Sequence, residues 1–473
     1  LVDWIEIYNS GTTAIDLTGF GLSDQEEDPF RWEFPEITIE PASFLLVYAS
    51  GKDRSGNNNK NLHTNFKLNV SGETVTLTAP TGGRVDALVT GRLEEGLSAG
   101  RYPDGGEGRF FFTQPSPGKK NTGEPHSGKT PEPLFSMRGG FYDESIVLTL
   151  APNTQHQDTV IRYTLDGKEP TATSAVYAAP LTINKTTAVR AKGFVSGLLP
   201  SKPVNETYFI DVDTELTVVS ILMDPEDLWN TRSGIYVLGY NAAKEFPHLG
   251  ANYWQAWEKP IHLQLFEANG RLGISADAGI RIAGQYSRAM PQKAFNIFAR
   301  DQYGSDVLEY PFFPEKTLTT QKAITLRQSG QDGTMSKIRD TLMTSLLSDT
   351  DLDYQAYRPA IVYLNGQYWG LYNIRERINE HFIAYNHDVD PLKIDLLQGN
   401  KIVRAGDDKH YVAMRDFVAT HDMRQEENYA YVQTQMDVEN FIDYWVAQVY
   451  FANTDTSNIR FWREKSNEGK WRW

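Results

Sequence analysis

The spacing of turn signals along the N-terminal part of the chain restricts its fold more than any other feature. From residue 1 to about residue 123, short segments rich in β-branched and aromatic residues alternate with turn sequences, and no segment keeps a helical periodicity. Ile5–Tyr8 and Phe44–Tyr48 are examples of the expected strands, and Ser71-Gly72 is an example of the turns. Short strands at this spacing are typical of a β-sandwich, which we predict for residues 1–123.

A linker and a second β-rich part follow. Residues 114–133 consist mainly of Pro, Gly and polar residues, and we place the linker itself at residues 124–133. Residues 134–211 again show strand patterns, such as the alternation of polar and apolar side chains in Thr187–Phe194. This pattern predicts a second, smaller β-sandwich.

The pattern changes at about residue 213. The turn sequences Asn269-Gly270 and Asn365-Gly366 each predict a β-hairpin. Apolar residues spaced by three and four predict helices over Met335–Leu346 and over Val438–Tyr450, with Asp437 as the N-cap of the second helix. Strands combined with helices predict an α+β domain over residues 213–473, so the whole chain of 473 residues is expected to be multidomain.

Composition excludes several classes of function. The chain has no cysteine, which rules out disulfides, thiolate metal sites and cysteine nucleophiles. Its net charge of −15 argues against binding to nucleic acid or to anionic lipid. No apolar run is long enough for a membrane span, and the sequence lacks the common phosphate-loop, metalloprotease, nucleophile-elbow and dinucleotide-binding signatures.

Three clusters in the α+β part carry candidate chemistry. The first, Gly279–Ile297, is expected to form a strand, a glycine-bearing loop that contains Arg288, and a second strand that begins near Lys293. A lysine that faces a cleft from a strand can hold phosphate oxygens as a point charge, so Lys293 and Arg288 are candidate nucleotide-binding residues. The alternative for Lys293 is a solvated side chain at a strand edge.

The second cluster is the return strand of the hairpin at Asn365-Gly366, which ends in Arg375-Glu376-Arg377. Glu376 is a candidate to pair with a lysine in the cleft and to orient that lysine toward a nucleotide. The alternative is a surface ion pair between Glu376 and one of the neighbouring arginines, worth about 0–1 kcal/mol.

The third cluster follows the apolar helix near the C-terminus. Asp455 and Asn458 lie on the segment between this helix and a strand that begins near Ile459. In phosphoryl-transfer loops of this layout, an aspartate accepts the proton of the substrate hydroxyl and an asparagine helps to bind magnesium. The alternative is an Asx turn after the helix, because Asp and Asn are common turn residues.

At these clusters the sequence resembles the CotH family of spore-coat-type, atypical protein kinases. The similarity runs in order over about residues 213–473. Besides the three clusters it rests on the segments Leu326–Gly330, Lys337–Asp340, Tyr368–Tyr372, Arg375–Arg377, Asn453–Asp455 and Phe461–Arg463.

The resemblance implies a divergent kinase-like fold, ATP and Mg²⁺ or Mn²⁺ as cofactors, and phosphate transfer to Ser or Thr hydroxyls of a protein substrate. By position, Asp455 corresponds to the catalytic base and Lys293 to the phosphate-binding lysine. Glu376 and Arg288 then belong to the nucleotide site, and Asn458 is a candidate metal ligand. Asp455 and Asn458 are three positions apart, whereas ordinary kinases separate the two residues by five.

The resemblance also implies missing segments. Family members continue after the Lys470–Trp473 strand into an Asp-containing segment that binds the metal. We therefore expect the sequence to be a fragment that lacks its main metal ligand and is inactive by itself. A first strand before Leu1 is expected to be missing as well.

Two further resemblances cover the N-terminal parts. The region 1–123 resembles a lamin-tail domain, an immunoglobulin-like sandwich, and the region 134–211 resembles the C-terminal domain of chitobiases and hexosaminidases. The segments that carry these resemblances are Asp3–Asn9, Leu17–Asp24, Leu62–Leu68 and Gly100–Gly105 for the first, and Gly139–Tyr142 and Ile161–Thr171 for the second. Together the three modules imply a secreted or cell-surface, extracytoplasmic protein of a bacterium.

Two functions are left open by the sequence. The first is an ATP-dependent kinase that acts on secreted or surface proteins. The second is a non-catalytic adhesion or scaffold protein whose β-modules bind a cell-surface polysaccharide. Trp4, Trp32 and Tyr102 are candidates for stacking on sugars, and the alternative for each is a place in a β-sandwich core.

Overall fold

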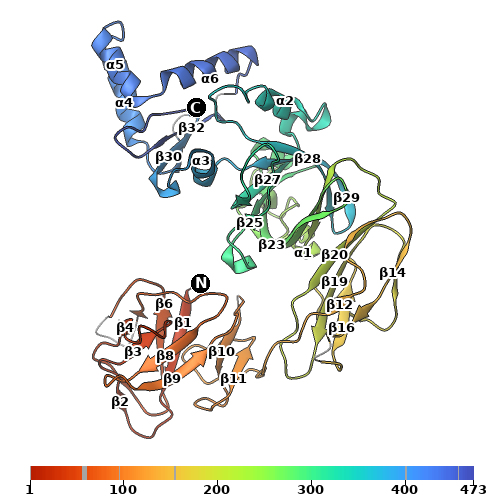
Figure 1. The fold of residues 1–473 in the computed structure, drawn as a ribbon, viewed down its shortest axis with the longest axis vertical. Helices are drawn as coiled ribbons and strands as arrows, with labels where there is room; N and C mark the ends of the chain where they lie inside the picture. The colour runs from red at the N-terminus through yellow and green to blue at the C-terminus, as the bar shows by residue number, and fades with distance from the viewer. Residues whose placement is uncertain (1, 56–60, 95, 154–155, 400–401, 456) are drawn as a thin grey trace.

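The computed structural model describes residues 2–55, 61–94, 96–153, 156–399, 402–455 and 457–473 (Figure 1). The N-terminal part consists mainly of β-strands, and the C-terminal part combines strands with helices, as the sequence predicts. In Figure 1 the strands near the N-terminus lie at one end of the molecule and the helices α4 (Lys409–Thr420), α5 (Glu426–Gln435) and α6 (Val438–Tyr450) lie at the other.

The first β-rich part contains two main sheets with an apolar core. The core includes Trp32, which is 3% exposed, so stacking of this residue on a sugar is excluded by its burial. Trp4 is partly buried in its strand, and 39% of Tyr102 is exposed. The sheets are formed by β1 (Asp3–Tyr8), β6 (Phe44–Ala49) and β7 (Leu62–His63), and by β4 (Trp32–Glu33), β3 (Gly21–Ser23), β8 (Thr74–Thr78) and β9 (Arg84–Val89), with the pairs β2 (Ile15–Asp16)–β5 (Thr38–Ile39) and β10 (Ser98–Arg101)–β11 (Arg109–Phe112).

The predicted linker is partly ordered by backbone hydrogen bonds. Ser127 and Thr130 donate to the carbonyls of Gly197 and Leu199, at 3.0 and 2.8 Å, and Thr130 is buried. Residues 124–133 are therefore held in part against the loop after β19. A segment without apolar side chains still docks when its backbone groups find partners in a neighbouring loop.

The second β-rich part is built on a five-stranded sheet. The sheet contains β13 (Gly140–Tyr142), β20 (Val204–Ile210), β19 (Thr187–Phe194), β16 (Val160–Thr164) and β17 (Ala175–Val176), beside the pairs β14 (Ile146–Leu148)–β18 (Leu181–Ile183) and β12 (Leu134–Phe135)–β15 (Leu150–Ala151). Phe209 of β20 joins an apolar cluster with Val218, Phe266 and Tyr363, and these three residues come from the next part of the chain. The second part therefore packs directly against the third (Figure 1).

The third part begins with a closed β-barrel, which the sequence patterns did not predict. Its strands are, in spatial order, β21 (Thr217–Leu222), β22 (Lys259–Phe266), β23 (Leu272–Ala283), β24 (Ala294–Phe298), β27 (Ala323–Arg327), β29 (Gln367–Glu376) and β28 (Tyr357–Leu364). The barrel closes because β21 pairs with β22 on one side and, in parallel, with β28 on the other. Phe295 and Ile297 alternate with outward-facing residues of β24 and lie in the barrel core. The two predicted Asn-Gly hairpins are confirmed as β22–β23 and β28–β29.

The helical end of the chain adds a small sheet. This sheet contains β31 (Ile402–Ala405), β30 (Ile394–Gln398) and β32 (Arg460–Glu464), and α3 (Glu380–His387) connects it to the barrel. The predicted helix over residues 438–450 is confirmed as α6, and the carboxylate of its N-cap Asp437 accepts a hydrogen bond from the amide of Asn440 at 3.1 Å. Phe441, Tyr444 and Ala447 face an apolar cluster, whereas 49% of Trp445 is exposed.

The helix predicted over Met335–Leu346 is wrong in extent and orientation. The α-helix α2 covers only Arg339–Ser345, and Leu342 on its apolar stripe is 52% exposed. The side of α2 that faces the barrel is polar instead, because Thr341 is 3% exposed and Asp340 binds an arginine of the barrel. Apolar spacing alone could not predict that a polar contact would orient this helix. Within the ranges described above, the helices are all too short or too polar to cross a membrane.

Candidate functional site

Lys293 lies at one mouth of the barrel, directly before β24. It is 4% exposed, so the alternative of a solvated lysine at a strand edge is wrong. Its Nζ atom donates hydrogen bonds to the carbonyls of Arg288 and Met290, at 2.7 and 2.9 Å, and lies 4.1 Å from the ring centre of Tyr253. The ammonium group therefore holds the loop before β24 against an aromatic wall.

Arg288 belongs to the same loop and is also held by carbonyl groups. Its Nε atom donates to Gly284 at 2.6 Å, and its Nη1 atom donates to the carbonyl of Trp254 at 3.2 Å. Burial lowers the pKa of the Arg288 guanidinium from its usual value. The structure thus brings Arg288 and Lys293 together, in contacts that fix the shape of the loop.

Lys293 should leave a signature in the pH dependence of stability. Burial lowers its pKa from 10.5 to about 8, so the folded protein binds fewer protons than the unfolded chain between these values. The contribution of Lys293 to the free energy of unfolding should therefore rise as the pH increases from about 8 towards 10. The measurement is the free energy of unfolding in urea of the unchanged protein and of Lys293→Met, at pH 7.5 and at pH 9.5. The advantage of the unchanged protein over Lys293→Met should be larger at pH 9.5, and the other titrating groups cancel in this difference. An equal difference at the two pH values would contradict the prediction.

Glu376 pairs with a lysine other than Lys293. Its Oε2 atom accepts hydrogen bonds from the Nζ atom of Lys316 at 2.7 Å and from the amide of Ala356 at 2.8 Å, and Asn386 of α3 donates to Oε1 at 3.2 Å. Glu376 is 1% exposed, so the alternative of a surface ion pair with a neighbouring arginine is wrong. Asn386, whose Oδ1 atom also accepts a hydrogen bond from Lys316 at 2.6 Å, joins this pair at the end of β29 to α3.

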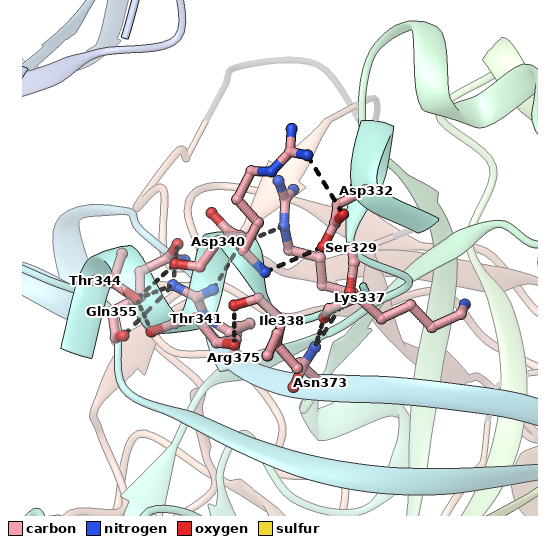
Figure 2. Close-up of polar contacts among 12 residues, drawn as sticks. Ser329, Asp332, Lys337, Ile338, Asp340, Thr341, Thr344, Gln355, Asn373 and Arg375 are labelled. Atoms are coloured by element: carbon pink, nitrogen blue, oxygen red, sulfur yellow. Dashed lines mark hydrogen bonds and ion pairs between the residues drawn. The ribbon is translucent and has the colours of Figure 1, made fainter. Parts of the chain in front are cut away.

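A polar network next to the barrel fixes α2 and the loop before it (Figure 2). Arg375 of β29 has a side chain that is 1% exposed, and its Nη1 atom binds Asp340 at 2.7 Å. Arg327 binds the same carboxylate oxygen at 2.7 Å. Figure 2 shows Asn373 directed toward Ser329 and Lys337, and its amide donates to both at 3.3 Å. The strand β29 thus supplies the groups that order the segment 329–340.

Asp455 lies on an exposed turn between α6 and β32. Its Oδ1 atom accepts hydrogen bonds from the amide and the hydroxyl of Ser457, at 3.1 and 2.7 Å, and its Oδ2 atom accepts one from Asn458 at 2.5 Å. These hydrogen bonds hold the pKa of Asp455 below its usual range, so the carboxylate is ionised at neutral pH. The Asx turn given as the alternative is present, and it leaves the carboxylate in contact with solvent.

The structure brings together some of the predicted site residues. Asp455 and Asn458 are hydrogen-bonded to each other, whereas no hydrogen bond or ion pair joins them to Lys293 or Glu376 in the part of the chain that the structure describes. Among those residues no three His, Asp or Glu side chains gather in a way that could hold a metal ion. Asn458 and its described neighbours therefore do not provide a full set of ligands for a divalent cation.

Sequence reasoning did not find Lys316, the partner of Glu376, or the role of Gln398. Gln398 of β30 donates from Nε2 to the carbonyl of Ser457 at 3.3 Å, which ties the Asp455 turn to the small sheet. Its Oε1 atom accepts from Arg404 at 2.9 Å and from Arg460 at 3.5 Å. The register between β30 and β32 places Gln398 opposite Arg460, residues that are far apart in the sequence.

Comparison with protein families gives three matches in sequence order. The lamin tail domain matches residues 2–92, the chitobiase/β-hexosaminidase C-terminal domain matches residues 137–205, and the CotH kinase protein family matches residues 280–473. The order agrees with the three resemblances found in the sequence. No curated protein matches the chain. The CotH match includes the loop with Lys293, the network of Figure 2 and the Asp455 turn.

Proposed function

We propose that the protein is a CotH-type kinase that transfers the γ-phosphate of ATP to Ser or Thr hydroxyls of a protein substrate. The observation that carries the proposal is the position of Asp455. This residue is an exposed, ionised carboxylate on a turn fixed to a sheet, inside the segment that matches the CotH kinase family.

In the proposed reaction Asp455 accepts the proton of the substrate hydroxyl as the oxygen attacks the γ-phosphorus, and the bond from this phosphorus to the β,γ-bridging oxygen breaks, so that ADP leaves. Because Ser457 and Asn458 donate to the carboxylate, its orientation is set before the substrate binds, which favours catalysis. The proposed role of Lys293 and Arg288 is to fix the loop before β24, and that of Glu376 is to join β29 to α3 through Lys316 and Asn386. A divalent cation, when bound, would neutralise phosphate charge in such a reaction.

We also propose that the protein acts outside the cytoplasm, on secreted or surface proteins. The support is the pair of β-rich modules before the kinase-type segment. These two modules match families other than kinases. The second module packs against the barrel through Phe209 and Phe266, whose ring centres are 5.4 Å apart, so these two parts are expected to act as one body.

The direct test is phosphate transfer from γ-labelled ATP, with Mg²⁺ or Mn²⁺, by the full-length gene product. Secreted proteins from the same source and a generic basic protein serve as acceptors, and phosphoamino-acid analysis identifies the residue that is modified. We expect label on Ser or Thr. Absence of transfer to any acceptor, together with absence of ATP binding in a thermal-shift measurement, would refute the kinase proposal and leave the scaffold function.

A further inference from the structure

Five arginines gather where the outer face of the barrel meets the small C-terminal sheet. Three of them surround one aromatic ring. The guanidinium carbons of Arg281, Arg300 and Arg377 lie 5.1, 4.9 and 5.1 Å from the ring centre of Phe298. Ile280 and Ile282 belong to the barrel core, so Arg281, which lies between them on β23, faces outward.

The other two arginines belong to the small sheet. Arg404 of β31 and Arg460 of β32 share the Oε1 atom of Gln398 as an acceptor. Arg460 also donates to the carbonyl of Ile378, which directly follows Arg377. This contact brings Arg460 beside Arg377, and so joins the two groups of arginines at the end of β29.

The positive charge of the cluster is only partly balanced. Glu258 binds Arg300 at 2.6 Å and Arg281 at 2.9 Å. Arg377, Arg404 and Arg460 form no ion pair with any residue that the structure describes. Burial, and then the charges of Arg404 and Arg377, lower the pKa of Arg460 to about 10. Burial also lowers the pKa of Arg377, and Glu380 acts against that shift. Stacking on Phe298 stabilises three guanidinium groups without neutralising them.

A cluster of guanidinium groups without enough carboxylates is suited to an anion with several charged oxygens. Guanidinium binds phosphate through two parallel hydrogen bonds, and it is less strongly hydrated than ammonium. Gln398 connects the cluster to the Asp455 turn, because its Oε1 atom binds Arg404 while its Nε2 atom binds the carbonyl of Ser457. The cluster and the Asp455 turn are therefore joined through one side chain, that of Gln398.

We propose that Arg281, Arg300, Arg377, Arg404 and Arg460 form the site that binds the phosphate groups of the nucleotide. This inference rests on the proposed kinase function and adds the residues that bind the phosphate groups of ATP. Phosphate binding is given to the arginines at the junction. Lys293, whose Nζ atom is held by two carbonyls and two aromatic rings, is left with a structural role.

The test measures binding and does not depend on turnover. Titration calorimetry at low salt with a metal chelator present would use ATP, inorganic tripolyphosphate and adenosine as three separate probes. We expect ATP and tripolyphosphate to bind and adenosine to bind much more weakly. Arg377→Gln and Arg460→Gln should each weaken both phosphate-bearing probes by about tenfold or more, the loss expected for one charge-assisted hydrogen bond.

Two variants serve as matched controls. Arg424→Gln removes an arginine that is paired with Asp422 on an exposed turn, and Lys293→Met removes the previously favoured lysine. Neither variant should change the affinity for tripolyphosphate by more than about twofold, which is well under the effect of losing one hydrogen bond. The melting temperature without ligand should stay the same or rise in Arg377→Gln, because a repelling charge is lost.

The outcomes separate this inference from the proposed function. If tripolyphosphate does not bind, or binds equally well to Arg377→Gln and Arg460→Gln, the arginine site is refuted even if the protein transfers phosphate. If Lys293→Met alone abolishes binding, the phosphate site lies at the barrel mouth and the inference is also refuted. If the arginine variants lose tripolyphosphate binding while no transfer from ATP occurs, the anion site stands and the kinase proposal fails.

Discussion

Asp455→Asn is expected to lower the rate of phosphate transfer by about 10²–10⁴-fold, the usual contribution of a general base. Asparagine keeps an oxygen that can accept the two hydrogen bonds of Ser457 but loses the acceptor of Asn458, so the change in the turn should stay local. It has no basic group to take up the proton of the substrate hydroxyl. The measurement is the initial rate of label transfer from ATP, beside the melting temperature of each protein.

The melting temperature should hardly change, because Asp455 is exposed and its contacts are local. Asp422→Asn is a suitable control, since Asp422 is also an exposed aspartate in a turn and binds only nearby groups, Arg424 among them. The control should transfer phosphate at the normal rate. Equal rates for Asp455→Asn and the unchanged protein would remove Asp455 from the mechanism, whatever its effect on stability.

Asp340→Ala should destabilise the fold by about 3 kcal/mol, the lower end of the cost of breaking a buried ion pair. The variant leaves the Arg375 side chain, which is 1% exposed, without its carboxylate partner. The remaining acceptors, on Thr344 and Gln355, are 3.4–3.5 Å away and carry no charge. We place the cost at the lower end because the Asp340 side chain is 33% exposed, so water weakens the pair. The measurement is the free energy of unfolding in urea.

A double-mutant cycle separates this explanation from a simple loss of packing. Arg375→Met replaces the buried charge by an apolar chain of similar length, and the double variant with Asp340→Ala should cost less than the sum of the single variants. Additive costs would show that Asp340 and Arg375 are not coupled. Asp340→Asn keeps one acceptor for Arg375, so its free energy of unfolding should lie between those of the unchanged protein and of Asp340→Ala.

Local features of the fold were predictable because their causes are local. The Asn-Gly sequences at 269–270 and 365–366 favour the positive φ angles of tight hairpins, and the structure has φ of 80° at Gly270 and 78° at Gly366. Asp437 precedes a run of apolar residues with helical spacing and caps α6 as expected. The same spacing failed over Met335–Leu346, because Arg375, which orients α2, is distant in sequence.

The residues of the candidate site also fall into two groups, those set by neighbouring residues and those set by contacts between distant parts of the chain. The sequence by itself marked Asp455 and Asn458, since a turn after a helix needs only neighbouring residues, and it marked the order of the three family matches. Only the tertiary structure decided that Lys293 is buried against Tyr253, that Glu376 pairs with Lys316, and that arginines from β23, β31 and β32 meet. The physical reason is that a charge finds its partner through strand register and barrel closure, which join residues that are far apart in the chain.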